Sequence, residues 1–140
     1  MTLSTLDTKY SRKLFLQGSL RYLAVSLVLI LFGMIYEHFS HGVYSLPMIY
    51  AFLFPLAGGA LPSLAMALYA RRFFPGKAFV NLWNCMLATF TVGSIFTGVL
   101  EIYGTANPLV RVYWIAGALL ALAAAFVWVS ERRAFNRQIA

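Results

Sequence analysis

The stretch 36–45, YEHFSHGVYS, gathers side chains that could bind a metal ion or move a proton. It holds Glu37, His38 and His41, which include both histidines and one of the four acidic residues of the chain. On a helix, residues 37 and 41 share a face, and residues 38 and 41 are also neighbours. Imidazole nitrogen and carboxylate oxygen are zinc ligands, and both groups titrate when their surroundings change. The stretch predicts either a ligand site or the polar end of a helix.

Two charged residues further along the chain are expected at the same place. Glu101 ends a long apolar segment, and Arg111 begins the next one. A carboxylate at a helix C-terminus and a guanidinium at a helix N-terminus each oppose the helix dipole, at a cost of about 0.3–1 kcal/mol. We therefore expect an ion pair between Arg111 and Glu101, or between Arg111 and Glu37.

This cluster has three alternative uses. Glu37, His41 and Glu101, with His38 as an alternate, could bind a divalent metal such as zinc. The same carboxylates and His41, together with Arg111, could bind protons or a small polar ligand, because burial moves the pKa values of such groups. The third alternative is a solvated helix end without a ligand. A haem site is disfavoured, because both histidines lie at one helix end.

The elements that position these residues follow from composition. Hydrophobic residues make up 61% of the chain, charged residues make up 11%, and the mean hydropathy is +0.78. These values indicate an all-α integral membrane protein. Four apolar segments, at about 22–39, 46–70, 78–103 and 108–130, are each long enough to cross a hydrocarbon core of ~30 Å. Short connections predict an antiparallel four-helix bundle forming a single transmembrane domain over residues 1–140.

The basic residues predict the orientation of this bundle. Ten of the eleven Lys and Arg residues flank the segments on one side, and only Arg111 lies on the other. The positive-inside rule therefore places both termini in the cytoplasm, in a cell membrane of the bacterial inner-membrane type. Residues 1–21 are expected to form a separate lead-in along the membrane interface. The charge of +7 is explained by topology and anionic headgroups, so nucleic acid is excluded as a partner.

The second apolar segment contains a helix-breaking run, PLAGGALP. Pro55 and Pro62 remove intrahelical hydrogen bonds, and Gly58 and Gly59 weaken helix propensity. The run predicts a kink or local unwinding. Carbonyl groups freed at this depth must find partners inside the protein, either as a structural kink or as a ligand site.

The third apolar segment carries a polar seam. Asn81, Asn84 and Thr91 lie within about half of the helix circumference, at ~100° per residue. Such residues act either as interhelical hydrogen-bonding groups or as a polar pathway, so Asn84 and Thr91 are candidate ligand- or proton-binding residues. The same segment holds the only cysteine, Cys85, which excludes an intramolecular disulfide and which we expect to be buried.

Turn signals and small residues predict the remaining contacts. Gly104 is expected to end the third helix, Asn107 to cap the fourth, and Pro108 to occupy its first turn. The fourth segment carries small residues at four-residue spacing, which favour close helix packing within the chain or in a homodimer. These residues are Gly117, Ala121 and Ala125.

Together these features predict a small polytopic membrane protein with an extracytoplasmic Glu/His/Arg pocket for a cation or small polar ligand, with transport as the expected function. A membrane enzyme acting on a lipid-like substrate and a structural or accessory subunit are the alternatives. Transport predicts a polar route from Glu101 through Thr91 and Asn84. Catalysis predicts a closed-ended pocket open to lipid or to the outer interface, and an accessory role predicts no cavity.

Overall fold

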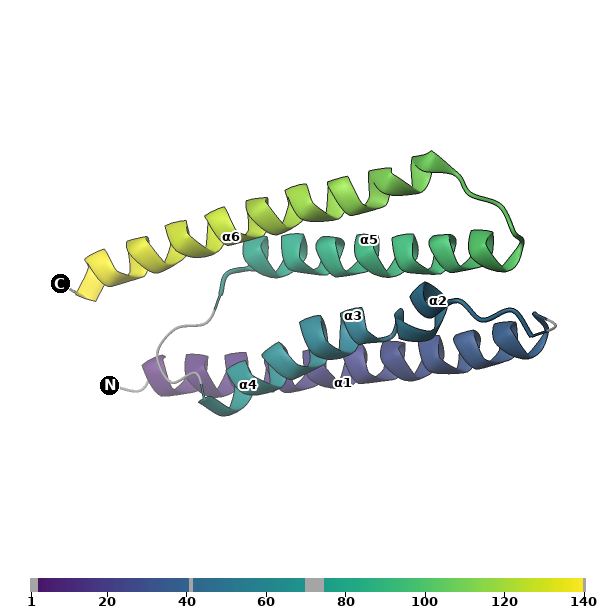
Figure 1. The fold of residues 1–140 in the computed structure, drawn as a ribbon. Helices are drawn as coiled ribbons and strands as arrows, with labels where there is room; N and C mark the ends of the chain where they lie inside the picture. The colour runs from purple at the N-terminus through teal and green to yellow at the C-terminus, as the bar shows by residue number, and fades with distance from the viewer. Residues whose placement is uncertain (1–2, 41, 70–74, 140) are drawn as a thin grey trace.

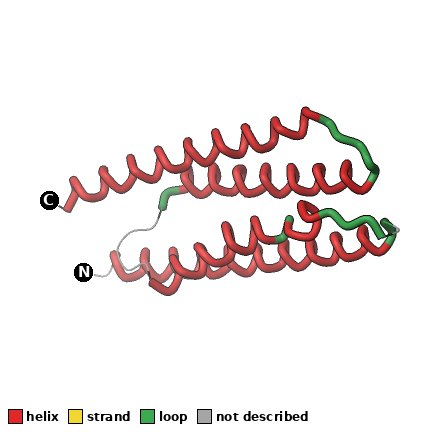
Figure 2. Tube along the Cα trace, viewed as in Figure 1, coloured by secondary structure: helices red, strands yellow, loops and turns green. Residues whose placement is uncertain are grey.

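The computed structural model describes residues 3–40, 42–69 and 75–139, and all regular secondary structure in these residues is helical (Figure 2). In this part of the chain, four helical segments are long and apolar enough to cross a membrane: Arg12–His38, Leu46–Tyr69, Lys77–Ile102 and Pro108–Arg137. The prediction of four apolar helical segments is therefore confirmed.

The first helix, α1 (Leu3–His38), is longer than expected. It runs without interruption through the segment expected to form a separate lead-in, because no proline occurs between residues 3 and 38. At 1.5 Å per residue its 36 residues extend about 54 Å, which exceeds a hydrocarbon core of ~30 Å.

The helices form two antiparallel pairs. Helix α1 packs along α4 (Leu61–Tyr69), and α5 (Lys77–Ile102) packs along α6 (Arg111–Ile139). The start of α1 and the end of α6 lie at one end of the bundle (Figure 1). We call this the basic end, because Arg12 and Lys13 lie in the first part of α1, Lys77 begins α5, and Arg132, Arg133 and Arg137 lie in the last part of α6. The opposite end, where Glu37 and Glu101 lie, is the acidic end.

The second apolar segment is broken, as its sequence predicts. It consists of α2 (Leu46–Tyr50), α3 (Leu53–Pro55), a π-helical turn η1 (Leu56–Ala60) and α4. Pro62 has no N–H group to offer the carbonyl of Gly58 four residues earlier. The indole N–H of Trp83 on α5 donates to that carbonyl instead, at 2.7 Å. Ser19 Oγ on α1 donates to the carbonyl of Ala60, at 3.0 Å. Protein side chains therefore serve these two carbonyls, which favours the structural kink over a ligand site at the break.

Two glycines allow the broken segment to approach its neighbours closely. The ring of Tyr22 on α1 packs directly on the backbone of Gly59, where a Cβ atom would clash with it. On α5, a Cβ atom at Gly98 would lie 2.7 Å from Met48 Cβ and 3.0 Å from Met48 N. The close contacts at Gly59 and Gly98 thus place the broken second segment directly against both α1 and α5.

The first of the three small residues of α6 packs against α5 of the same chain. Gly117 is buried, and a Cβ atom there would lie 2.5 Å from the ring of Phe90. Ala121 is partly exposed and Ala125 is exposed. The part of this face at Gly117 is thus covered by α5 of the same chain. A homodimer through Gly117, Ala121 and Ala125 stays a prediction.

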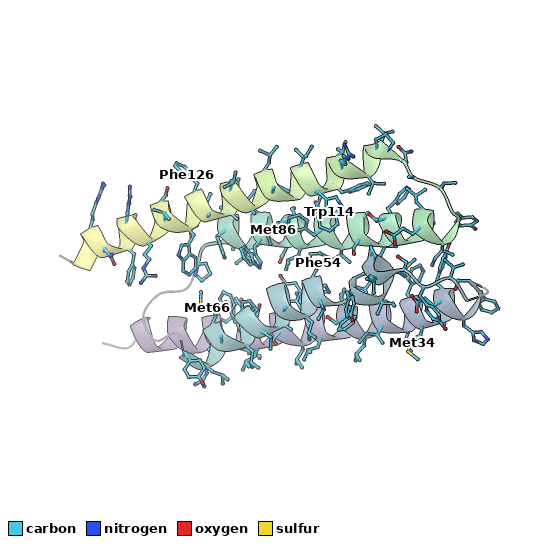
Figure 3. All side chains as sticks on the ribbon, in the orientation of Figure 1. Met34, Phe54, Met66, Met86, Trp114 and Phe126 are labelled. Carbon is cyan, nitrogen blue, oxygen red and sulfur yellow. The ribbon has the colours of Figure 1, made fainter. Side chains whose placement is uncertain are left out.

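An aromatic cluster joins three of the four apolar segments. Phe54 of α3, Phe90 of α5 and Trp114 of α6 meet with ring centroids 5.7–6.1 Å apart. Other large apolar side chains point away from the bundle (Figure 3): Phe126 is 74% exposed and Met34 is 65% exposed. A bundle whose outer surface is this apolar suits a lipid environment.

One expectation for α5 is wrong. Cys85 is exposed, whereas Met86 and Leu87 beside it are buried. Packing against α6 and the broken segment decides which side of α5 is covered, and it turns Cys85 outward.

The connection between α5 and α6 has the predicted turn chemistry. Gly104 adopts a φ of 69°, and the N–H of Thr105 donates to the carbonyl of Leu100 at 2.9 Å, which closes the helix end. Asn107 Oδ1 accepts from the N–H of Leu109 at 2.9 Å, and Pro108 begins the short 3₁₀ helix η2 (Pro108–Val110). All three expectations for this turn are confirmed.

Replacing Gly98 with alanine should destabilise the protein by about 1–3 kcal/mol, because the new methyl group would press on the backbone of Met48. Gly18→Ala is the matched control, since its Cβ atom would meet only Ser63 Oγ at 4.0 Å. Thermal unfolding in detergent, followed by circular dichroism, measures both. Equal thermal midpoints for the two variants would contradict the packing described.

Candidate functional site

Ser45 joins the two carboxylates of the acidic end. Its hydroxyl donates to Glu101 Oε2 at 2.6 Å, and its backbone N–H donates to Glu37 Oε1 at 3.4 Å. Ser45 is only 1% exposed, so these bonds are shielded from solvent on the serine side. A short hydrogen bond to a carboxylate is among the stronger polar contacts in proteins. Ser45 thus links α1, the start of α2 and the end of α5.

Sequence analysis missed Ser45. The residue immediately precedes α2, whose second residue is proline, and this position predicts a helix cap. Its side chain makes no cap hydrogen bond and is used for Glu101 instead. The sequence allows Ser45 to be recognised as a helix-capping position, but it does not indicate that the hydroxyl would donate to Glu101.

The structure brings together only part of the predicted cluster. Glu37 and Glu101 share Ser45, whereas His38 is exposed and lies edge-on to the ring of Phe39 at 5.4 Å. His41 lies outside the described residues. Among the residues that are described, no group of three potential metal ligands is found. The metal site at Glu37, His38, His41 and Glu101 stays a prediction.

The expected ion pair is not formed in the described part of the chain. Arg111 is exposed and has no salt bridge with Glu37 or Glu101 there. The hydroxyl of Ser45 provides Glu101 with a hydrogen-bond donor, which offsets its unfavourable position at the helix C-terminus. The predicted ion pair of Arg111 is therefore wrong, because a neutral donor lies beside Glu101 where a charged one was expected. The role of Arg111 as a ligand- or proton-binding residue stays a prediction.

The polar side chains of α5 mainly form hydrogen bonds, either within α5 or to neighbouring segments. Thr91 Oγ1 donates to the carbonyl of Leu87 in its own helix at 2.8 Å. Ser94 Oγ donates to the carbonyl of Pro47 at 2.7 Å. Asn84 Oδ1 accepts a hydrogen bond from the hydroxyl of Tyr22 on α1. These bonds favour structural use of the seam over a polar route, and Asn81 and Asn84 border open space.

Two adjoining hollows open toward the basic end, where the helices diverge. Helix α5 contacts α2, α3 and η1 but makes little contact with α4. The first, which we call the aromatic hollow, has a volume of about 420 Å³ and is walled by Met66, Phe79, Trp83 and Trp128. Met66 points from α4 toward the α5–α6 pair (Figure 3). The second, the basic hollow, has a volume of about 510 Å³ and is lined by Arg21, Lys77 and Asn81 among others.

The Tyr22–Asn84 pair borders both hollows, together with Phe15, Ser63, Pro75 and Val80. Tyr22 is held by the packing of its ring on Gly59 and by its hydrogen bond to Asn84. Because the hollows share these residues, they adjoin each other, one mainly apolar and the other more polar.

The charge of this space is positive. Arg21 and Lys77 are exposed and line the basic hollow, and none of its described lining residues is acidic. Glu131 on α6 does not line it, and its Oε2 accepts from the N–H of Gly76 at 2.8 Å. Asn84 was predicted from the sequence as a site residue, whereas Arg21, Lys77, Tyr22 and Trp83 were not. Aromatic and basic residues near membrane boundaries are too common for their types to mark a site.

The fold and the site define an all-helical protein with four candidate membrane spans and an amphipathic hollow at its basic end. A comparison of the chain with protein-family models, with curated proteins and with solved structures found no match.

Replacing Ser45 with alanine should lower the free energy of unfolding by about 0.5–1.5 kcal/mol, because the exposed carboxylate of Glu101 loses its hydrogen bond from a buried hydroxyl. Ser130→Ala is the control, since Ser130 is exposed and its hydroxyl bonds only the carbonyl of Phe126 in its own helix. Thermal midpoints in detergent at neutral pH compare the two. A Ser45→Ala protein as stable as the Ser130→Ala protein would mean that the Ser45–Glu101 bond has no structural importance.

Proposed function

We propose that this chain is a multi-pass membrane protein that binds a lipid-like molecule in the aromatic hollow. The observation that carries the proposal is the hollow itself, with its wall of Met66, Phe79, Trp83 and Trp128 inside the candidate spans. Its volume of about 420 Å³ is in the range of small-molecule sites. An apolar hollow of this kind disfavours water and favours a hydrocarbon chain.

The proposed orientation places both termini in the cytoplasm of a cell with a bacterial-type inner membrane. The concentration of basic residues at one end supports it through the positive-inside rule. The common location of the start of α1 and the end of α6 agrees with an even number of spans (Figure 1). In this orientation the hollows face the cytoplasmic leaflet, and the acidic end faces outward.

A lipid-like ligand fits the site better than a small cation that moves through the bundle. Thr91 and Ser94, which would line such a route, donate to backbone carbonyls. The hollow carries aromatic walls instead, and its polar pair, Tyr22 and Asn84, is hydrogen-bonded internally. The proposal is one of binding, because neither Tyr22 nor Asn84 is paired with a base that would activate it for catalysis.

Cysteine labelling tests the orientation. In a Cys85→Ser parent, a cysteine introduced at Thr105 should react with a membrane-impermeant maleimide in intact cells. A cysteine introduced at Ala134 should react only after permeabilisation. Both positions are exposed in the structure, so accessibility does not depend on unfolding. The opposite labelling pattern would overturn the proposed topology.

Fluorescence quenching tests whether the aromatic hollow binds a lipid-like molecule. A protein with Trp83 as its only tryptophan (Trp114→Phe, Trp128→Phe) is titrated in detergent with a lysophosphatidate that carries a dibrominated stearoyl chain. We expect saturable quenching, because Trp83 forms part of the wall of the hollow. Adding Ala125→Phe should fill the hollow and raise the half-maximal concentration at least ~10-fold, which is a loss of about 1.4 kcal/mol.

The control for that titration is Ala118→Phe, an exposed position on the same helix that does not line the hollow. It should leave the titration unchanged. Quenching that never saturates, or that Ala125→Phe and Ala118→Phe affect equally, would show that the probe reaches Trp83 only from the surrounding micelle.

A further inference from the structure

We infer that the basic hollow binds the phosphate-type headgroup of the same molecule whose hydrocarbon chain occupies the aromatic hollow. The inference rests on the proposed function and names the chemistry of the ligand at its polar end. The two hollows share lining residues from α1, α4 and α5, including Tyr22, Ser63 and Asn84. The hollows therefore adjoin, as two subsites for one molecule require.

Charge complementarity favours an anion in the basic hollow. Arg21 on α1 and Lys77 at the first turn of α5 reach it from two different helices. None of its described lining residues carries a negative charge. A guanidinium group offers a planar pair of N–H donors that matches two oxygens of a phosphate, and an ammonium group adds a second positive charge.

The neutral polar groups also favour a ligand rich in acceptors. Asn84 uses its side-chain oxygen as the acceptor for the hydroxyl of Tyr22. The amide group of Asn84 keeps both of its N–H donors for a ligand. Asn81 lies one turn earlier on α5 and lines the same hollow. With Arg21 and Lys77, these amides make N–H donors the main polar feature of the basic hollow, and phosphate oxygens are suitable acceptors.

The position of the hollow along the bundle agrees with a lipid headgroup. Lys77 is the first residue of the third candidate span, and Arg21 lies nine residues into the first span, Arg12–His38. The bound headgroup would thus lie near the start of α5, with the chain directed past Tyr22 toward Trp83 and Trp128. Headgroup outward and chain inward is the orientation of a lipid in a leaflet.

The Tyr22–Asn84 pair sets the boundary between the two subsites. Tyr22 cannot move toward the second segment, because its ring already lies on the backbone of Gly59. Its hydroxyl is tied to α5 through Asn84. The pair therefore fixes the point at which polar surroundings give way to aromatic ones, which makes Tyr22 and Asn84 specificity-determining residues for an amphipathic ligand.

The test compares two brominated probes on the protein that has Trp83 as its only tryptophan. One is lysophosphatidate with a dibrominated stearoyl chain, and the other is the monoacylglycerol with the same chain and no phosphate. We expect the phosphate probe to reach half-maximal quenching at a concentration about tenfold lower. The double variant Arg21→Gln/Lys77→Gln should abolish this preference by weakening only the phosphate probe. Arg132→Gln/Arg133→Gln, which removes two exposed charges at the same end, should preserve it.

Each outcome decides one question. Equal, saturable quenching by both probes in the protein that has Trp83 as its only tryptophan, without further substitutions, would overturn the headgroup inference and leave the proposed function intact. Quenching that saturates with neither probe would overturn both. Equal weakening in the two double variants would assign the preference to the general charge of the basic end and overturn the inference. Full displacement of the phosphate probe by millimolar inorganic phosphate would identify the hollow as a site for free phosphate, whereas resistance to it supports a lipid headgroup.

Discussion

The hydrogen bond from the indole N–H of Trp83 to the carbonyl of Gly58 is the interaction on which the arrangement of this bundle depends. A backbone carbonyl without a partner costs several kcal/mol in an apolar medium, so a helix can break there only if another part of the protein supplies a donor. Pro62 frees the carbonyl, and α5 supplies the donor. Beyond the break, α4 packs on α1 and makes little contact with α5, and the two hollows are lined by residues of all three helices.

The two ends of the bundle use their polar residues differently. At the acidic end, Ser45 connects Glu37 and Glu101, and the broken segment packs on Gly98 of α5. This end is tightly joined. At the basic end the helices diverge, and the polar groups line open space. The chain thus combines a closed end that joins three of the four helical segments with an open end that offers both charge and apolar surface, as binding of an amphiphile requires.

The candidate site was only partly predictable. The sequence indicated that Glu37 and Glu101 lie at one end and that Asn84 faces other helices, and the structure agrees. It could not indicate that a serine would take the place of Arg111 beside Glu101. Nor could it show that Arg21 and Lys77, which are 56 residues apart in the sequence, line one hollow. Each of these outcomes depends on contacts between helices, whereas residue type and spacing describe one helix at a time.

The sequence by itself determined the properties that depend on local or summed energies. These are the four apolar segments, the break at Pro55–Pro62, the cap at Asn107, the turn at Gly104 and the unequal distribution of basic residues. The tertiary structure decided how each helix is rotated, and so it buried Met86 while exposing Cys85, placed Gly117 against Phe90, and opened the hollows beside Trp83. The physical reason is that helical periodicity fixes which side chains share a face, but only packing against another helix determines what that face meets.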